Sequence, residues 1–184
     1  QQPVTNLRDA VNHLGTDTVK RVAVLSSAAN LLGAELKGYR LIQGAFWKHS
    51  VAVASGAQRI ARQCGGVDPS AAFTAGLLHD LGKVVLHEFV ELELDAIFAR
   101  VNESGEAFPI AEKNALGCSH PEIGAALAEA WKLPPYVVAV IKHQHAPSNA
   151  GEHRRLVSVV HLANSLAIMA GIGIGADGLA YEID

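Results

Sequence analysis

Helical periodicity runs along almost the whole of this chain. No segment shows the strict alternation of apolar and polar residues that is typical of a half-buried strand. Alanine, the strongest helix former, is abundant. With 184 residues, of which 49% are hydrophobic, the chain can bury a sizeable core without disulfides or a structural metal. We therefore predict an all-α fold, a compact helical bundle that forms one domain over residues 1–184.

Glycine, proline and capping residues divide the chain into helices. Thr16 or Asp17 can cap a long helix that runs to residue 32. Asp68-Pro69 is a fitting helix start, and Gly82 is expected to break or bend the helix that follows. The expected helices cover residues 7–14, 17–32, 41–64, 71–81, 91–102, 109–116, 120–131, 135–145 and 156–169.

The overall charge argues against a protein that holds nucleic acid mainly through its phosphates. The formal net charge is −3 and the pI is near 6.3, whereas such a protein carries a basic surface. Two cysteines, Cys64 and Cys118, are too few and too widely spaced for a disulfide framework or a metal knuckle. We therefore expect no nucleic-acid partner and a reducing, cytoplasmic compartment.

The longest stretch without a charged residue, residues 156–176, is long enough to raise the question of a membrane span. Its polar residues recur at three- and four-residue spacings on one side of a helix, and Gly171, Gly173 and Gly175 weaken its end. Polar groups are costly inside a bilayer, whereas one apolar face suffices for a soluble core. We therefore expect a buried helix here and no membrane association.

The chain begins with Gln1-Gln2-Pro3, and its single methionine is Met169, so we expect it to be part of a longer polypeptide. The helix over residues 17–32 carries more apolar positions than one stripe can hold. These positions are Val19, Val22, Ala23, Leu25, Ala29, Leu31 and Leu32. We expect upstream helices to cover part of this surface, which would otherwise be exposed and promote self-association.

An apolar run that ends in charged side chains marks residues 75–83, Ala-Gly-Leu-Leu-His-Asp-Leu-Gly-Lys. Adjacent His79 and Asp80 can ligate one divalent ion, because a neutral imidazole supplies nitrogen and the carboxylate cancels charge. Lys83 lies one helical turn away and could hold a phosphate. The alternative is a solvated polar cluster at a helix end, which the dipeptide alone does not exclude.

The residues around this dipeptide are similar to those of a known family. In chain order, the similar segments are residues 7–15, 46–50, 75–83, 112 with 116–125, 131–134 and 143–147. Together they resemble the HDOD domain, the HD-related output domain of bacterial signalling proteins, over residues 7 to about 170. The resemblance implies a helical bundle of the HD-domain type. It also implies additional helices upstream of the part that matches residues 7–15.

The HDOD family belongs to the HD superfamily of metal-dependent phosphohydrolases, so the resemblance implies a metal site. Its ligands would be a His, an adjacent His-Asp pair and a distant Asp. The corresponding residues here are His49, His79, Asp80 and, at the last position, Asn164. With Asn164 in place of aspartate a bound dication keeps a net +1 charge, and a neutral amide oxygen is a poorer ligand for a hard ion. We therefore expect these side chains to converge and a metal to bind weakly or not at all.

Relatives with two metals add further histidines, and the resemblance gives this role to His120, His143 and His145. Gln144 stands where many relatives have histidine, so the second site is altered as well. The Gly-Tyr-Pro signature of the related HD-GYP cyclic-dinucleotide phosphodiesterases is replaced by Ala-Pro-Ser-Asn-Ala-Gly at residues 146–151. For His120 and His145 the alternative is a hydrogen-bonded imidazole at a helix end.

Other conspicuous side chains are expected to be structural. Cys118 is close to His120 in the sequence, but no third group orients a nucleophile, so a packed thiol is expected. Trp47 and Trp131 lie among apolar neighbours at helical spacings and are expected in the core. The further histidines expected to be structural are His13, His87, His153 and His161.

Three functions are compatible with these residues. The favoured hypothesis is a non-catalytic signalling output domain that acts on other signalling proteins or on domains of the same polypeptide. The alternative is a phosphohydrolase of nucleotides or cyclic nucleotides, in which a divalent metal (Mn, Mg, Fe or Zn) activates water and Lys83 is the catalytic residue that neutralises phosphate. A helical interaction scaffold is the second alternative. Asn164 and Gln144 favour the first hypothesis, whereas His79, Asp80 and Lys83 favour the phosphohydrolase.

Overall fold

The computed structural model describes residues 15–176. Within them the regular structure is helical, apart from one isolated bridge between Leu36 and Leu41, so the all-α prediction is confirmed. The α-helices are α2 (Thr16–Leu32), α3 (Ala45–Cys64), α4 (Pro69–Leu78), α5 (Gly82–Leu92), α6 (Leu94–Ser104), α7 (Phe108–Leu116), α8 (His120–Ala130), α9 (Pro135–His143) and α10 (Arg154–Met169). Short 3-10 turns are η1 (Lys37–Tyr39), η2 (Pro147–Asn149) and η3 (Gly151–His153). The helix expected over residues 7–14 lies outside the described residues.

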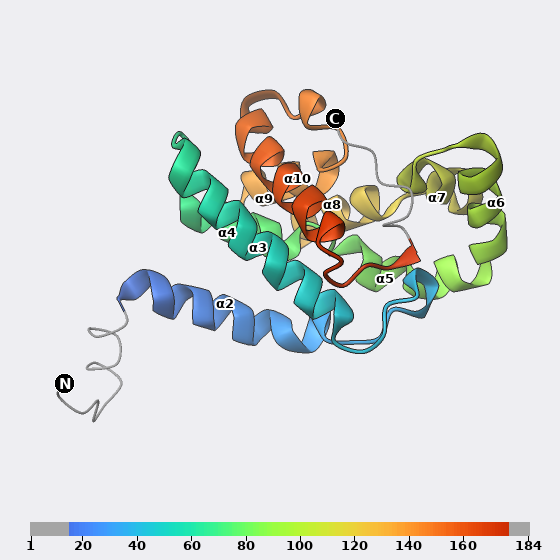
Figure 1. Cartoon of the computed structure of the whole chain (residues 1–184), viewed down its shortest axis with the longest axis horizontal. Coiled ribbons are helices and arrows are strands. Elements are labelled where there is room, and N and C mark those ends of the chain that lie inside the picture. Colours follow the sequence, from blue (N-terminus) through green and yellow to red (C-terminus); the bar gives the residue numbers. More distant parts are fainter. Residues whose placement is uncertain (1–14, 177–184) are drawn as a thin grey trace.

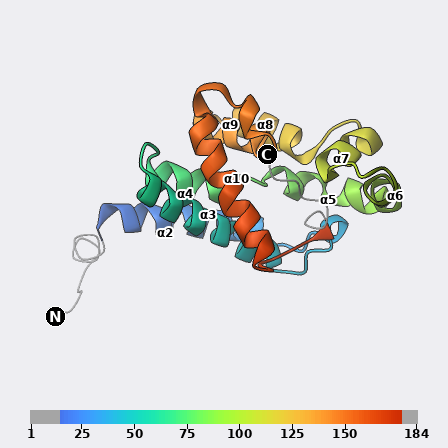
Figure 2. The ribbon, with the colours of Figure 1, turned by 45° about the horizontal axis from the view of Figure 1, so that its top comes forward.

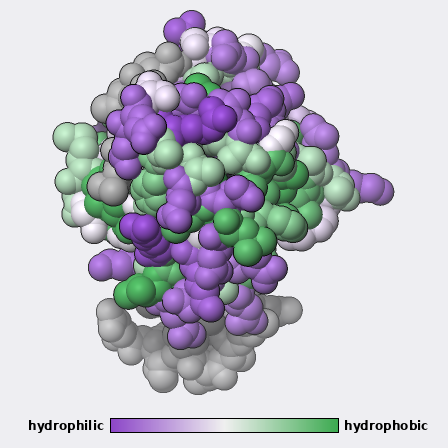
Figure 3. All heavy atoms as spheres, turned by 90° about the vertical axis from the view of Figure 1, so that its right-hand side faces the viewer, coloured by the Kyte–Doolittle hydropathy of each residue, from purple (hydrophilic) through white to green (hydrophobic). Residues whose placement is uncertain are grey.

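The helices pack as a layered bundle around α3 and α4 (Figure 1). Helix α10 crosses α3, and α2 lies along the other side of the α3–α4 hairpin (Figure 2). Helices α8 and α9 pair with each other, and α5 packs against α8. Helices α6 and α7 form the end of the molecule farthest from the start of α2, where hydrophilic and apolar side chains are interspersed on the surface (Figure 3).

Three buried apolar clusters hold the bundle together. The largest joins α2 to α7 and includes the rings of Tyr39, Phe46 and Phe108. A second lies where α10 packs on α3 and α4, and a third between α8 and α9. Each fully buried large side chain stabilises the fold by about 1.5–3 kcal/mol relative to an exposed one. The helices that contribute to these clusters are therefore fixed relative to one another, which also fixes the polar side chains that they carry.

Gly82 has a packing role in addition to the helix break expected from the sequence. Helix α4 ends at Leu78, three residues form a turn, and α5 begins at Gly82 itself and runs to Leu92. The helix does break before Gly82, and residues 82–90, which the expected helices leave out, belong to α5. A Cβ atom at Gly82 would collide with the carbonyl oxygen of His120. The glycine therefore permits the close approach of α5 and α8, and the turn before it carries His79 and Asp80.

Other helix boundaries shift by a few residues. Helix α3 begins at Ala45 instead of residue 41, because Gly44 adopts a φ of 79° and donates its N–H to the carbonyl oxygen of Gly33 over 3.1 Å. Helix α2 has Gly15 at its N-cap, with no side-chain cap hydrogen bond. Helix α9 ends at His143 instead of residue 145, and α6 spans Leu94–Ser104 where residues 91–102 were expected. Asp68 caps α4 as predicted, accepting from Ser70 N over 2.9 Å.

The predicted core position is wrong for Trp131, which is 52% exposed. Trp47 is partly buried and packs against the largest apolar cluster. On α2, Leu32 is fully buried and Leu25 is partly buried, whereas the side chains of Val19 and Val22 lie outside the described residues. An open apolar groove of about 420 Å³ lies between α2, α4 and the end of α8.

The uncharged stretch near the end of the chain forms α10 and the segment after it. Helix α10 is 16 residues long and buries His161, Asn164 and Ser165 together with its apolar face. None of the helices in the described part of the chain has the length and apolar character that crossing a membrane requires. The expectation of a buried helix here is confirmed.

Candidate metal centre

Five helices and the turns beside them bring histidine and carboxylate side chains to one region of the bundle. His49 comes from α3, His79 and Asp80 from the α4–α5 turn, His120 from the start of α8, and His145 from the residues after α9. The possible ligand atoms of His49, His79 and Asp80 all lie within 4.8 Å of one another. The same is true of Asp80, His120 and His145. Asp80 is therefore shared by two neighbouring groups of possible metal ligands.

The ring of His79 is held so that one nitrogen faces Asp80. Its Nδ1 lies 2.8 Å from the carbonyl oxygen of Gly76, so Nδ1 carries the proton and donates it. Nε2 is buried, has no hydrogen-bond partner among the described residues and lies 3.3 Å from Oδ2 of Asp80. A cation or a proton between these two atoms would satisfy both.

Both carboxylate oxygens of Asp80 have protein donors. Lys83 Nζ binds Oδ2, and Nε2 of Gln144 donates to Oδ1 over 3.0 Å. Burial alone would raise the pKa of Asp80, but the charges of His79 and Lys83 outweigh burial and hold this pKa well below its usual value. Asp80 is therefore ionised, and its charge is matched by a buried ammonium group.

A second hydrogen-bonded network fixes the ring of His120. The buried carboxylate of Glu112 accepts from the backbone N–H of His120 over 2.9 Å and lies 2.6 Å from its Nδ1. Tyr39 donates its hydroxyl to the other oxygen of Glu112 over 2.6 Å. Nε2 of His120 is thus turned toward Nε2 of His145, 3.1 Å away, and toward Oδ1 of Asp80, 3.6 Å away. Glu112 and Tyr39 hold His120 in the orientation of a ligand.

Loss of hydration lowers the pKa values of two histidines in the site. Burial is the main cause at His49, and the neighbouring His79 adds to it. At His145, burial and the nearby His120 hold the pKa well below its usual value. Both imidazoles are therefore neutral at pH 7, which is the form that ligates a metal.

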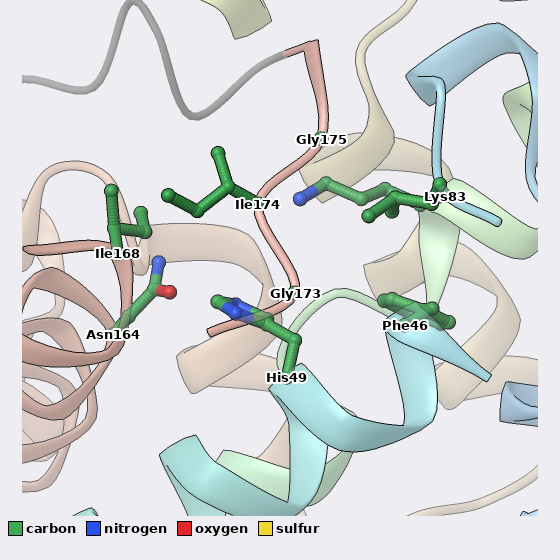
Figure 4. A pocket seen from close by; sticks show the side chains of 9 residues that line it. Phe46, His49, Lys83, Asn164, Ile168, Gly173, Ile174 and Gly175 are labelled. Atoms are coloured by element: carbon green, nitrogen blue, oxygen red, sulfur yellow. The ribbon is translucent and has the colours of Figure 1, made fainter. Parts of the chain in front are cut away.

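Asn164 lies on the opposite side of His49 from Lys83 (Figure 4). All three residues line a pocket of about 10 Å³, about the space that one water molecule needs. Oδ1 of Asn164 is buried and has no hydrogen-bond partner within residues 15–176. An amide oxygen in this position is an acceptor that faces the same pocket as His49.

The donor types of this region fit a divalent cation. His79 Nε2, Asn164 Oδ1 and Gln144 Oε1 are buried polar atoms without a partner among the described residues, and imidazole nitrogens and amide or carboxylate oxygens are metal ligands. The charge fits less well, because Asp80 is the one carboxylate in the two ligand groups and Lys83 already neutralises it. His49, His79 and Asp80 are the residues that would hold a metal.

His143 is separate from the two ligand groups. It is partly exposed and lines a different, open groove together with Lys142 and His153. Because α9 ends at His143, the side chains of Gln144 and His145 turn inward while that of His143 faces this groove. Of the seven side chains that the sequence assigned to a metal site, five form the two ligand groups, Asn164 shares a pocket with His49, and His143 lies apart.

Several residues expected to be structural have ordinary environments, whereas Nδ1 of His87 is buried without a hydrogen-bond partner among the described residues. His161 is buried and its Nδ1 lies 2.6 Å from the carbonyl oxygen of Gln144, while His153 lies on the surface beside Glu152. Cys118 packs against the apolar core. Burial, aided by nearby carboxylates, raises the pKa of the Cys118 thiol, which opposes a nucleophilic role. His13 lies outside the described residues.

Three contributors to the site were not identified from the sequence. Tyr39 lies in a short turn with no motif around it, and Glu112 was part of the family motif without a role. The third is the backbone carbonyl of Ile172, to which Nδ1 of His49 is hydrogen-bonded over 2.9 Å. Its only sequence signal is the alternation of Gly171, Gly173 and Gly175.

Comparison with solved structures supports the fold assignment. An HDOD domain protein from Geobacter sulfurreducens has a TM-score of 0.77 and 29% identity, and the similarity covers 94% of this chain and 58% of that chain. A candidate phosphohydrolase from Shewanella amazonensis SB2B has a TM-score of 0.74 and 29% identity, with 96% of this chain and 71% of that chain covered. Both are similar to this protein in fold and sequence.

Among curated proteins, Ribonuclease Y from Thermus thermophilus is 36% identical over 103 residues, which is 56% of this chain and 13% of the enzyme. This chain spans less than a fifth of the length of the first curated relatives that it matches. The family model for the HDOD domain matches residues 1–147, a range that begins and ends earlier than the resemblance over residues 7 to about 170. It includes His49, His79, Asp80, His120 and His145. The chain therefore belongs to the HDOD domain family.

Proposed function

We propose that this domain is a non-catalytic output domain of a signalling protein, in which the HD pocket has lost its enzymatic role. The observation that carries the proposal is that both carboxylate oxygens of Asp80 are bound by protein donors. Lys83 and Gln144 bind its two oxygens, so the carboxylate that a metal needs is already satisfied by the protein. Asn164 adds no charge. The pocket keeps the arrangement of a metal site, but the ammonium group of Lys83 takes the place of the cation beside Asp80.

A charge comparison supports this proposal. A metal in this pocket would meet one carboxylate, from Asp80, and one ammonium group, from Lys83, so the ligand set contributes no net negative charge. A bound metal would supply a water of lowered pKa as nucleophile, which is the chemistry of the phosphohydrolases. Lys83 would have to leave Asp80 before it could neutralise a phosphate. Each of these requirements opposes catalysis in the arrangement observed.

Metal-dependent hydrolysis of a nucleotide or cyclic nucleotide is the second candidate function. It is favoured by Nε2 of His79, which faces Asp80 and has no hydrogen-bond partner in the described part of the chain. The similarity to Ribonuclease Y and to a candidate phosphohydrolase points in the same direction. Under this alternative, His49, His79 and Asp80 hold the metal, and Lys83 turns toward the substrate.

Turnover assays separate the two functions. The chain would be incubated with Mn²⁺ and, in separate reactions, a cyclic dinucleotide, a cyclic mononucleotide and a generic phosphodiester. The proposal expects the wild-type protein, His79→Ala and Asp80→Ala to show the same background rate. His153→Ala, which changes a surface histidine, is the matched control. Turnover by the wild type and by His153→Ala that disappears in the other two variants would establish the phosphohydrolase instead.

The proposed partners are other signalling proteins or other domains of the same polypeptide. A signalling role predicts that His79→Ala or Asp80→Ala, introduced into the complete protein, alters its response to the input. A plain helical scaffold predicts that a folded variant responds like the wild type. Circular dichroism of each variant would first establish that it folds.

A further inference from the structure

The segment that follows α10, residues 171–176, lies over His49. The N–H of Ile172 donates to the carbonyl oxygen of Ala167 over 3.0 Å, which turns the chain back from the helix end. The carbonyl oxygen of Ile172 accepts a hydrogen bond from Nδ1 of His49 over 2.9 Å. At the other end of the segment, Ala176 is buried in the largest apolar cluster. We call residues 171–176 the strap, because both of its ends are held on the domain.

Glycine allows the strap to lie directly on α3. Gly173 has a φ of 61°, and a Cβ atom there would lie 2.5 Å from the carbonyl oxygen of Ala45 and 2.8 Å from Cβ of His49. Gly171 has a similar φ of 72°, but a Cβ atom there would meet nothing within 4 Å. The close contact at His49 therefore depends on Gly173, whereas Gly171 serves the turn alone.

The strap also forms part of the pocket wall. Gly173, Ile174 and Gly175 pass between Lys83 on one side and Asn164 on the other (Figure 4). The space that remains is about 10 Å³, which admits about one water molecule. A phosphate group, with five heavy atoms, does not fit beside His49 and Lys83 in this arrangement.

We propose that the strap is a built-in cover of the HD pocket, and that it must lift before any ligand larger than water reaches His49 and Lys83. This role rests on the signalling function proposed above. A ligand that enters the pocket would displace the strap, and the displacement would change the structure at the end of α10. The closed strap occupies the space that a ligand larger than water would need beside His49 and Lys83, so each excludes the other. The signal would pass to whatever follows or contacts this end of the domain.

Chemical labelling of His49 in the full chain tests the cover. Diethyl pyrocarbonate adds an ethoxyformyl group to accessible imidazole nitrogens, and mass spectrometry gives the rate at each histidine. His49 is 6% exposed in the closed arrangement, whereas the His153 side chain is 30% exposed and serves as internal reference. We expect Gly173→Ala to raise the rate at His49 by about tenfold relative to His153, because the new methyl group displaces the strap and local opening controls access.

Gly171→Ala is the matched control. It introduces the same backbone strain at positive φ without a collision at His49, so its effect on His49 labelling should be clearly smaller. An unchanged labelling rate in Gly173→Ala would overturn the proposal. Equal increases in the two glycine variants would overturn it as well, because the collision with His49 would then be irrelevant.

Amide hydrogen exchange provides a second test that does not depend on the folding of Gly173→Ala. His49→Ala removes the group that donates to Ile172, and we expect exchange across residues 171–176 to accelerate by about threefold or more. His153→Ala should leave this exchange unchanged. Unaltered exchange in His49→Ala would show that the pocket does not hold the strap. Neither test uses turnover, so failure here leaves the signalling proposal standing, and turnover would overturn that proposal without affecting the strap.

Discussion

The side-chain amide of Gln144 donates a hydrogen bond to Oδ1 of Asp80 over 3.0 Å, and the same amide group donates to the carbonyl oxygen of His79 over 2.8 Å. A glutamine after α9 thereby secures the turn that carries the His-Asp pair. Histidine at this position would offer a metal ligand, whereas the glutamine Nε2 offers donors. Gln144 thus removes a ligand from the second metal site and at the same time stabilises the turn that carries His79 and Asp80.

Replacing Asn164 with aspartate should improve metal binding. We expect the wild-type protein to bind Mn²⁺ weakly or not at all, and Asn164→Asp to bind it at least about tenfold more tightly, because a second carboxylate near the dication adds Coulomb attraction. Isothermal titration calorimetry measures both affinities. Asn149→Asp adds the same charge at an exposed position and should change little. Equal affinities for wild type and Asn164→Asp would mean that Asn164 is not at the metal position.

Lys83→Met should destabilise the protein and make it responsive to metal. It leaves the buried carboxylate of Asp80 without its counter-charge, which typically costs about 3–5 kcal/mol. Mn²⁺ should restore much of the lost thermal stability, as measured by differential scanning calorimetry. Lys113→Met breaks an exposed pair with Glu122 and should cost about 1 kcal/mol or less, with no response to metal. A Lys83→Met protein as stable as wild type would contradict the pairing with Asp80.

Tyr39→Phe tests the network behind His120. The variant leaves one oxygen of the buried Glu112 without the tyrosine hydroxyl, and we expect the free energy of unfolding to fall by about 1–3 kcal/mol. Urea denaturation gives the value. Tyr136→Phe, which removes the same hydroxyl from a half-buried ring in α9, is the control and should cost less. Similar losses in the two variants would argue against a special role of the Tyr39–Glu112 contact.

Stability should fall as the pH is lowered from 7.5 to 5.5. The pKa values of His49 and His145 are lowered in the folded protein, mainly by burial, so the unfolded chain binds more protons just below pH 6.5 and acidification favours unfolding. The depressed pKa of Asp80 adds to this only at more acidic pH, where unfolded aspartate becomes protonated.

Urea denaturation at the two pH values measures this difference. His145→Gln should reduce the loss of stability between pH 7.5 and 5.5, because one of the two neutral imidazoles is gone. His153→Gln should leave the loss as in the wild type. Greater stability at pH 5.5 than at pH 7.5 would show that these imidazoles are not held neutral in the folded state.

Much of the fold was predictable because its signals are local. The helical periodicity, the Asp68-Pro69 start and the start of α8 at His120 depend on residues within one or two turns of each other, and the structure has them where the sequence placed them. The packing role of Gly82 was not predictable. A glycine that breaks a helix and a glycine that admits another helix have the same sequence signature, and only the packing of α5 on α8 distinguishes them.

The amino-acid sequence by itself determined an all-α domain of the HDOD family and the positions that could ligate a metal. Tertiary packing decided what those positions do. It joined Lys83 to Asp80, turned His143 toward a separate groove while Gln144 and His145 face inward, and placed the carbonyl of Ile172 on His49 across 123 positions of sequence. The physical reason is that the spacing of apolar residues along a helix shows which of its faces is buried. The hydrogen-bond partners in a buried pocket depend instead on how helices that are distant in the sequence approach one another.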